Sequence, residues 1–223
     1  MSYLKYIGHL DLVRLFQRAF NKAEIDLAYS QGFNPHPKFS IANPLSLGIE
    51  SEEEYMDIEL NTEIPAEEFM EKMNAVLPRG IQITRGAYVE DKRAVASIID
   101  WALYEITFET ERIWDRDALK NKIEDYLDRD EIIITKRKRK KRRKIEVEVD
   151  VRNLIREVEL KEIRENKISL EALLKSGGNG NLKPLKLIKS LKAYENIDID
   201  LDSVNIKRTG LFVEEKGEIV KPI

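Results

Sequence analysis

The two histidines of this 223-residue chain lie in one polar region near its N-terminus, with His36 between two prolines. A metal-free ribonuclease can use one histidine as a general base on a 2′-hydroxyl and a second group as the acid. Lys38 and Tyr29 could assist such a reaction electrostatically. By ligand type, His9, Asp11 and His36 could also hold a metal, but their spacing matches no specific metal motif. Catalysis and metal binding are two hypotheses for this region.

A third hypothesis, which we favour, is that this region recognises a ligand or partner. Residues 29–40 combine tyrosine, serine, glutamine, asparagine and histidine with one glycine and two prolines. Such a composition is poor for filling a core and suits a shaped polar surface. Purely structural roles for both histidines stay open. The candidate binding residues are His9, Asp11, Arg14, Arg18, Tyr29, Ser30, Gln31, Phe33, Asn34, His36 and Lys38.

A second chemical signal is a run of nine consecutive cations at residues 136–144. The remaining 29 basic residues face 41 acidic ones, so the rest of the chain carries about −12. Adjacent strand residues point to opposite faces, so neither face of this run can be buried. Contact with phosphates relieves the repulsion and releases counterions. The residues expected to contact a nucleic-acid backbone are Lys136, Arg137, Lys138, Arg139, Lys140, Lys141, Arg142, Arg143 and Lys144.

The basic run contains no aromatic residue, so we expect it to bind the backbone and to read no base sequence. Two alternatives stay open. The run could be a solvated hairpin tip that pairs only with the acidic remainder of the chain, or it could contact an anionic membrane surface.

Composition excludes several classes of protein. The chain has no cysteine, which rules out disulfides, thiolate zinc sites, cysteine nucleophiles and cysteine-ligated iron–sulfur clusters. No apolar run is long enough for a transmembrane helix, and the first residues are too mixed for a signal peptide. We therefore expect a cytoplasmic protein that does not enter a membrane and has neither a cofactor nor a metal site.

The elements that must position these residues fall into two similar series. The first has a helix over 9–23, strands near 39–45 and 55–60, a helix from Pro65, and a strand at 81–84. The second has a strand at 102–109, a helix at 117–127, strands at 157–163 and 167–174, a helix at 184–191, and strands at 204–207 and 211–213.

Each series approximates the strand–helix–strand–strand–helix–strand order of the ferredoxin-like fold. We therefore predict an α+β protein of two tandem ferredoxin-like units, residues 1–90 and 91–223. The first unit has at most a stub of its first strand in residues 1–7. The second contains an inserted basic hairpin over 132–149, where Ile145, Val147, Val149 and Val151 alternate with acidic residues.

Several motifs resemble one bacterial family. They are residues 8–14 (GHLDLVR), 18–19 (RA), 29–37 (YSQGFNPHP), 44–51 (PLSLGIES) and 54–60 (EYMDIEL), with weaker similarity at 150–152 and 207–211. Together they resemble the radical-SAM-linked protein family, whose domain has no assigned function. The resemblance spans nearly the whole chain, and residues 29–37 are its most specific part. It implies association with a radical-SAM protein and a setting in RNA or ribosome biology.

The resemblance also implies a first strand before residues 6–11, where this sequence has only a few residues. Because a radical-SAM enzyme holds its cluster with cysteines, the cysteine-free chain would be its partner. The leading hypothesis is a non-catalytic accessory protein that binds RNA or a ribosome-associated particle. The alternatives are a metal-independent endoribonuclease that uses His9 and His36, or a pure protein–protein adaptor.

Overall fold

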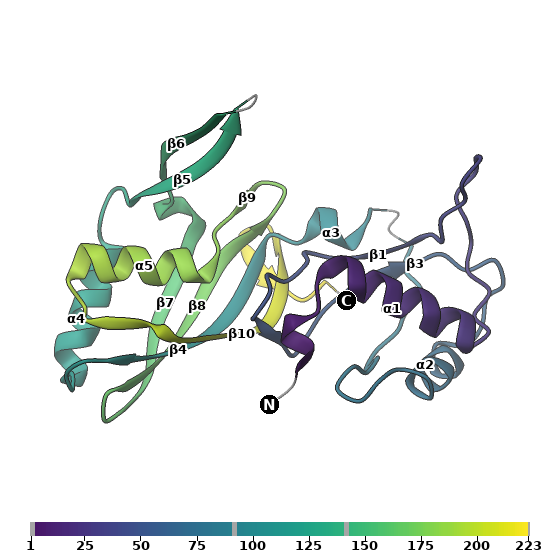
Figure 1. Ribbon diagram of the computed structural model, residues 1–223, viewed down its shortest axis with the longest axis horizontal. Helices are drawn as coiled ribbons and strands as arrows, with labels where there is room; N and C mark the ends of the chain where they lie inside the picture. Colours follow the sequence, from purple (N-terminus) through teal and green to yellow (C-terminus); the bar gives the residue numbers. More distant parts are fainter. Residues whose placement is uncertain (1–2, 91–92, 141–142, 223) are drawn as a thin grey trace. The chain divides into compact units, whose positions relative to one another are not determined.

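The computed structural model describes residues 3–90, 93–140 and 143–222 and contains both helices and sheets, so the predicted α+β class is confirmed (Figure 1). The chain divides into two compact units. Unit 1 comprises residues 1–50, 54–99 and 221–223, and unit 2 comprises residues 51–53 and 100–220.

Unit 1 is built on one amphipathic helix, a small sheet and a second helix. Its elements, in chain order, are η1 (Tyr3–Tyr6), α1 (His9–Lys22), β1 (Phe39–Ile41), β3 (Met56–Ile58), α2 (Ala66–Asn74) and α3 (Val95–Ile98). Strands β1 and β3 pair antiparallel, with Ser40 opposite Asp57.

The core of unit 1 forms where one face of α1 packs on this sheet and on α2. Phe16, Ala19 and Phe20 recur at helical spacing and are buried. The ring of Phe20 contacts Phe39 of β1 edge-on, with centroids 5.2 Å apart, and lies 6.5 Å from the ring of Phe69 of α2. The polar face of α1 is thereby left to solvent.

Two strands expected in the first series are not formed. Residues 3–6 form a 3-10 helix instead of a strand stub, and residues 81–84 are not part of any sheet. Ile83 is bound by a side chain in place of a neighbouring strand. Its N–H donates to Asn74 Oδ1 and its carbonyl accepts from Asn74 Nδ2, both at 2.8 Å. Unit 1 therefore contains the central helix–strand–strand–helix part of the predicted order.

Unit 2 contains the complete ferredoxin-like order. Its main elements are β4 (Trp101–Thr110), α4 (Arg116–Leu127), β7 (Ile155–Arg164), β8 (Lys167–Gly177), α5 (Pro184–Glu195) and β10 (Ile199–Glu215). The strands lie in the order β10-β4-β8-β7, and each neighbouring pair is antiparallel. The first strand thus lies between the third and the fourth, as this fold requires.

Shorter elements extend this sheet. They are β2 (Glu50–Ser51) and β11 (Glu218–Val220), which pair with β10, and β9 (Gly180–Asn181), which pairs with β8. The 3-10 helix η2 (Arg152–Leu154) precedes β7.

Helices α4 and α5 cover one face of the sheet of unit 2 (Figure 1). Along β4, Tyr104, Ile106 and Phe108 are buried, whereas Glu105 and Thr107 alternate with them on the other face. Between the helices, the buried hydroxyl of Tyr126 lies 2.6 Å from Ser190 Oγ. No helix in the described part of the chain is long and apolar enough to cross a membrane.

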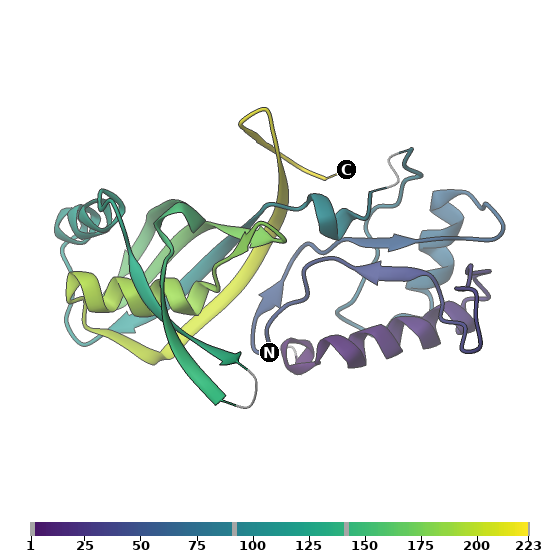
Figure 2. The same cartoon turned by 90° about the horizontal axis from the view of Figure 1, so that it is seen from above.

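The predicted basic hairpin is inserted between α4 and β7. Strands β5 (Ile133–Lys140) and β6 (Arg143–Asp150) form a separate two-stranded sheet, and within the described residues they pair with no other strand. Both cartoon views show this hairpin extending away from the main sheet of unit 2 (Figures 1 and 2). Residues 141 and 142 lie outside the described residues.

Candidate nucleic-acid interface

The specific motif of unit 1 folds into a hairpin, residues 28–38, which we call the motif hairpin. Tyr29 forms an antiparallel bridge with Pro37. The Ser30 N–H donates to His36 O at 2.8 Å, and the His36 N–H donates to Ser30 Oγ at 2.9 Å. The Lys38 N–H closes the base by donating to Ala28 O. The motif hairpin is therefore an ordered projection held by its own backbone.

The end of β3 anchors the base of this hairpin. The Ala28 N–H donates to Glu59 O, and the Glu59 N–H donates to Lys38 O. The Lys38 ammonium also donates to Glu59 Oε1 at 2.7 Å. Lys38 therefore stabilises the base of the hairpin through its backbone N–H and through an ion pair with Glu59.

The tip of the motif hairpin presents an aromatic ring to solvent. Phe33 has a relative exposure of 113%, and Tyr29 nearer the base is 49% exposed. Gly32 adopts φ +131°, a backbone conformation that glycine tolerates and other residues rarely adopt. Gln31, Asn34 and His36 are exposed around the tip. Asn34 Nδ2 lies 3.5 Å from His36 Nε2.

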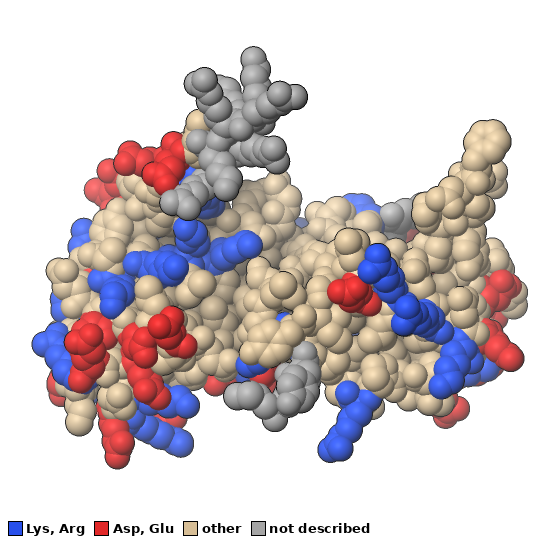
Figure 3. Space-filling model, viewed as in Figure 1, with Lys and Arg blue, Asp and Glu red and all other residues tan. Residues whose placement is uncertain are grey.

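Helix α1 carries exposed cations along its polar face. Arg14 and Arg18, both predicted from the sequence, are followed at the same interval by Lys22, which was not predicted. We call Arg14, Arg18 and Lys22 the cationic stripe, and Figure 3 shows blue side chains in a row over α1. Arg14 pairs with Asp11 at 3.1 Å, an exposed contact that is worth little in water.

The two histidines lie apart. His9 opens α1, whereas the motif hairpin lies beyond the C-terminal end of that helix in both cartoon views (Figures 1 and 2). A 14-residue helix spans about 21 Å, so His9 and His36 are too far apart to act together at one phosphodiester. The described residues also contain no group of three or more acidic or histidine side chains placed to hold a metal ion.

The basic hairpin brings like charges opposite one another. Its register pairs Lys140 with Arg143 and Arg139 with Lys144, whereas Arg137 faces Glu146. Like charges directly opposite on paired strands are destabilising. The register thus places residues of like charge opposite one another at the end of the hairpin, an arrangement that favours contact with a polyanion.

The root of the basic hairpin is fixed to unit 2. Asp150 Oδ1 accepts from the N–H groups of Arg152 and Ile132, each at 2.9 Å, and these donors hold the pKa of Asp150 below its ordinary value. The Arg152 guanidinium donates to the carbonyl oxygens of Leu127 and Ile155. Asp150 and Arg152 thus connect the root of the hairpin to the end of α4 and the start of β7.

The face of the unit 2 sheet that the helices leave uncovered carries several ion pairs. Lys161 contacts Glu159 at 3.0 Å and Glu171 at 3.3 Å, and Lys207 contacts Glu105 at 3.1 Å. The strongly exposed aromatic side chains, among residues whose exposure is described, all belong to unit 1: Tyr6, Tyr29, Phe33 and Tyr88. This face therefore offers no aromatic platform on which bases could stack.

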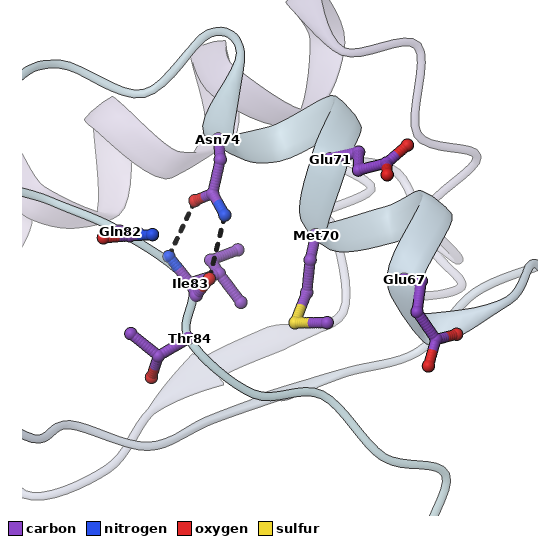
Figure 4. Close-up of a pocket in the computed structure, with 7 residues that line it drawn as sticks. All are labelled: Glu67, Met70, Glu71, Asn74, Gln82, Ile83 and Thr84. Carbon is purple, nitrogen blue, oxygen red and sulfur yellow. Dashed lines mark hydrogen bonds between the residues drawn. The ribbon is translucent and has the colours of Figure 1, made fainter.

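A groove of about 560 Å³ lies in unit 1 between α2 and residues 82–84 (Figure 4). Glu67, Met70 and Glu71 line it from the helix, and the Asn74–Ile83 hydrogen bonds close one side. The groove holds two exposed carboxylates and no histidine or cation, so it supplies no acid–base pair for cleaving RNA.

Comparison with protein families identifies the group to which these features belong. Residues 1–184 match DUF2344, described as an uncharacterized protein conserved in bacteria. The chain belongs to this family. The DUF2344 match includes all of the motif hairpin, α1 and the basic hairpin. No curated protein matches the sequence.

Solved structures similar to this DUF2344 chain include chains of complexes that contain Cbf5 or an H/ACA RNP. A chain in the crystal structure of a Cbf5-Nop10-Gar1 complex has a TM-score of 0.52 and 11% identity over 94% of this chain. A chain in a structure of an H/ACA RNP bound to a substrate RNA containing 2′-deoxyuridine has a TM-score of 0.48 and 10% identity over 91%. The present chain spans about half of the first structure's chain (47%) and 43% of the second. The first likeness concerns the fold alone.

Proposed function

We propose that this protein is a non-catalytic accessory protein that binds RNA or a ribonucleoprotein. The observation that carries the proposal is the basic hairpin: seven of the nine consecutive cations, residues 136–140 and 143–144, lie on two strands that, among the described residues, pair only with each other. The two like-charge pairs at its end favour contact with a polyanion. The motif hairpin and the exposed face of α1 supply the contacts that select the ligand.

An accessory role is favoured over catalysis by the positions of the two histidines. His9 opens α1 and the motif hairpin that carries His36 follows its C-terminal end, which argues against the ribonuclease hypothesis. Incubation of RNA with the protein in the presence of EDTA tests this directly. We expect intact RNA, and cleavage that is lost in His36→Ala would overturn the non-catalytic assignment.

The partner that we propose is a radical-SAM enzyme. This part of the proposal rests on the family motifs in residues 8–14 and 29–37 and on the absence of cysteine, which leaves the iron–sulfur cluster to another chain. Capture of the protein from native bacterial lysate, followed by mass spectrometry and RNA sequencing, tests both partners. Recovery of RNA with an enzyme carrying a cysteine-ligated cluster is expected, whereas recovery of protein without RNA would favour the adaptor hypothesis.

RNA binding itself is tested by replacing residues 136–144 with a neutral turn of equal length. The replaced protein should bind RNA more weakly and with a flatter salt dependence, because fewer counterions are released. Unchanged affinity at low salt would refute the proposed role of the basic hairpin.

A further inference from the structure

Unit 1 combines a solvent-exposed ring with a line of cations, and the basic hairpin of unit 2 provides no such ring. Phe33 contributes nothing to the core, although hydrogen bonds between Ser30 and His36, one to a backbone carbonyl and one to the Ser30 hydroxyl, close the hairpin below it. An aromatic ring on an ordered loop loses little conformational freedom when it stacks on a ligand. Phe33 is therefore suited to stack on a flat ring of a ligand.

The cationic stripe lies on the helix that leads to this hairpin (Figures 1 and 3). Its members are four residues apart, which corresponds to about 6 Å along the helix axis. This spacing is close to the roughly 7 Å axial advance of two nucleotides in a stacked strand. Within the described residues, Arg18 and Lys22 form no ion pair, and Arg14 has only its exposed contact with Asp11.

We propose that α1 and the motif hairpin form a binding site for single-stranded RNA, in which phosphates follow the cationic stripe and an unpaired base stacks on Phe33. This proposal rests on the RNA-binding function proposed above and names the kind of RNA. A base inside a duplex has both faces covered by its neighbours, whereas an unpaired base offers a free face to an aromatic side chain. The site therefore selects single strands, loops or bulges.

The polar residues around the tip fit this ligand better than they fit a lipid surface. Gln31, Asn34 and His36 are exposed beside Phe33 and carry donors and acceptors that can meet the edges of a base. A lipid-inserting tip would instead surround its aromatic ring with apolar side chains. The basic hairpin then adds affinity for the backbone, and the motif hairpin adds the preference for unpaired bases.

The test compares binding of the full chain to a labelled single-stranded RNA of about 12 nucleotides and to a duplex of the same sequence. Phe33→Ala should weaken single-strand binding by about 5- to 150-fold, the value of one stacked base, and leave duplex binding nearly unchanged. Phe33→Trp, which keeps an aromatic ring at this position, should retain single-strand binding. Leu47→Ala, which truncates another exposed apolar side chain of unit 1, is the matched control and should have no effect.

The stripe has its own readout. Replacing Arg18 and Lys22 with glutamine should lower the slope of log affinity against log salt by about 1.4 on the single strand. Asn21→Gln is the neutral control on the same helix and should keep the slope.

The outcomes separate this inference from the function on which it rests. If the wild-type protein binds both RNAs and Phe33→Ala matches Leu47→Ala, the single-strand site is wrong and RNA binding stands. If the wild-type protein binds neither RNA at low salt, the proposed function is wrong as well. Binding to vesicles of phosphatidylcholine with about 30% phosphatidylserine that depends on Phe33, in the absence of RNA binding, would overturn both in favour of a membrane site.

Discussion

Neutralising the end of the basic hairpin should change the salt dependence of RNA binding by a calculable amount. The register places Arg139 opposite Lys144 and Lys140 opposite Arg143. Replacing these four residues with glutamine removes both like-charge pairs and four of the nine consecutive cations. The backbone ladder that forms the hairpin does not depend on these charges.

The expected magnitude follows from counterion release. Each phosphate neutralised on a single strand contributes about 0.7 to the slope of log affinity against log salt, so four lost contacts lower the slope by about 3. Between about 50 and 200 mM salt, the wild-type protein should therefore lose roughly 50-fold more affinity than the quadruple variant. Fluorescence anisotropy with a labelled RNA at several salt concentrations measures both slopes.

A matched variant separates local contacts from net charge. Four exposed lysines of unit 2 outside the hairpin can be changed to glutamine for the same loss of charge: Lys167, Lys183, Lys186 and Lys189. The slope should change little in this control. The thermal midpoint of the hairpin variant should be unchanged or raised, because cross-strand repulsion is removed. Equal slopes for the two quadruple variants would refute phosphate binding by the hairpin.

Other predictions concern stability and its dependence on pH. In urea unfolding, Ser190→Ala should cost about 1–3 kcal/mol, because it leaves the buried Tyr126 hydroxyl unpaired, whereas Tyr126→Phe should cost about 1 kcal/mol. Burial raises the pKa of Tyr126 to about 12, so the unfolded phenol ionises first and stability should fall by up to about 1.4 kcal/mol per pH unit between about pH 10 and 12. Tyr126→Phe should remove this contribution, and an identical alkaline slope in that variant would contradict the assignment. The lowered pKa of Asp150 gives the opposite sign: its stabilisation is present above about pH 4 and disappears as pH falls below it. Amide protection at Ile132 and Arg152, measured by NMR, should fall in the wild type as Asp150 is protonated, whereas Asp150→Asn, which has no carboxylate to titrate, should already show lower protection at neutral pH; equal protection in the two proteins at neutral pH would exclude the root contact.

The spacing of apolar residues predicted the helices and strands that bury one face against the rest of their own unit. The apolar spacing of Phe16, Ala19 and Phe20 marked α1, and the alternation after residue 144 marked β6. The complete helix and strand order of unit 2 likewise followed from the sequence. Burial of an alternating or helical face explains why these patterns were sufficient.

Elements that depend on a neighbour were harder to predict. Ile81 and Ile83 have the alternation of a strand, but the side-chain amide of Asn74 satisfies the backbone of Ile83 in place of a paired strand. The sequence predicted two short strands at 204–207 and 211–213, whereas β10 is continuous over this region, with shifts in register on either side of residues 205–208.

The candidate binding residues showed the same limit. Composition drew attention to residues 29–40, but the separation of His9 from His36 depends on the position of α1, which no local pattern reveals. Lys22 was not among the candidates that the sequence analysis named. Its four-residue interval from Arg18 was the available signal.

The division of the core between two units has a spectroscopic consequence. Both tryptophans of the chain, Trp101 and Trp114, lie in unit 2, where their indole N–H groups donate to Glu214 and Asp198. Intrinsic tryptophan emission therefore reports on unit 2, and melting of unit 1 alone would leave the tryptophan environments unchanged. The Phe33→Trp variant would introduce an indole into unit 1. Its fluorescence would report ligand stacking, in addition to the constant emission of Trp101 and Trp114.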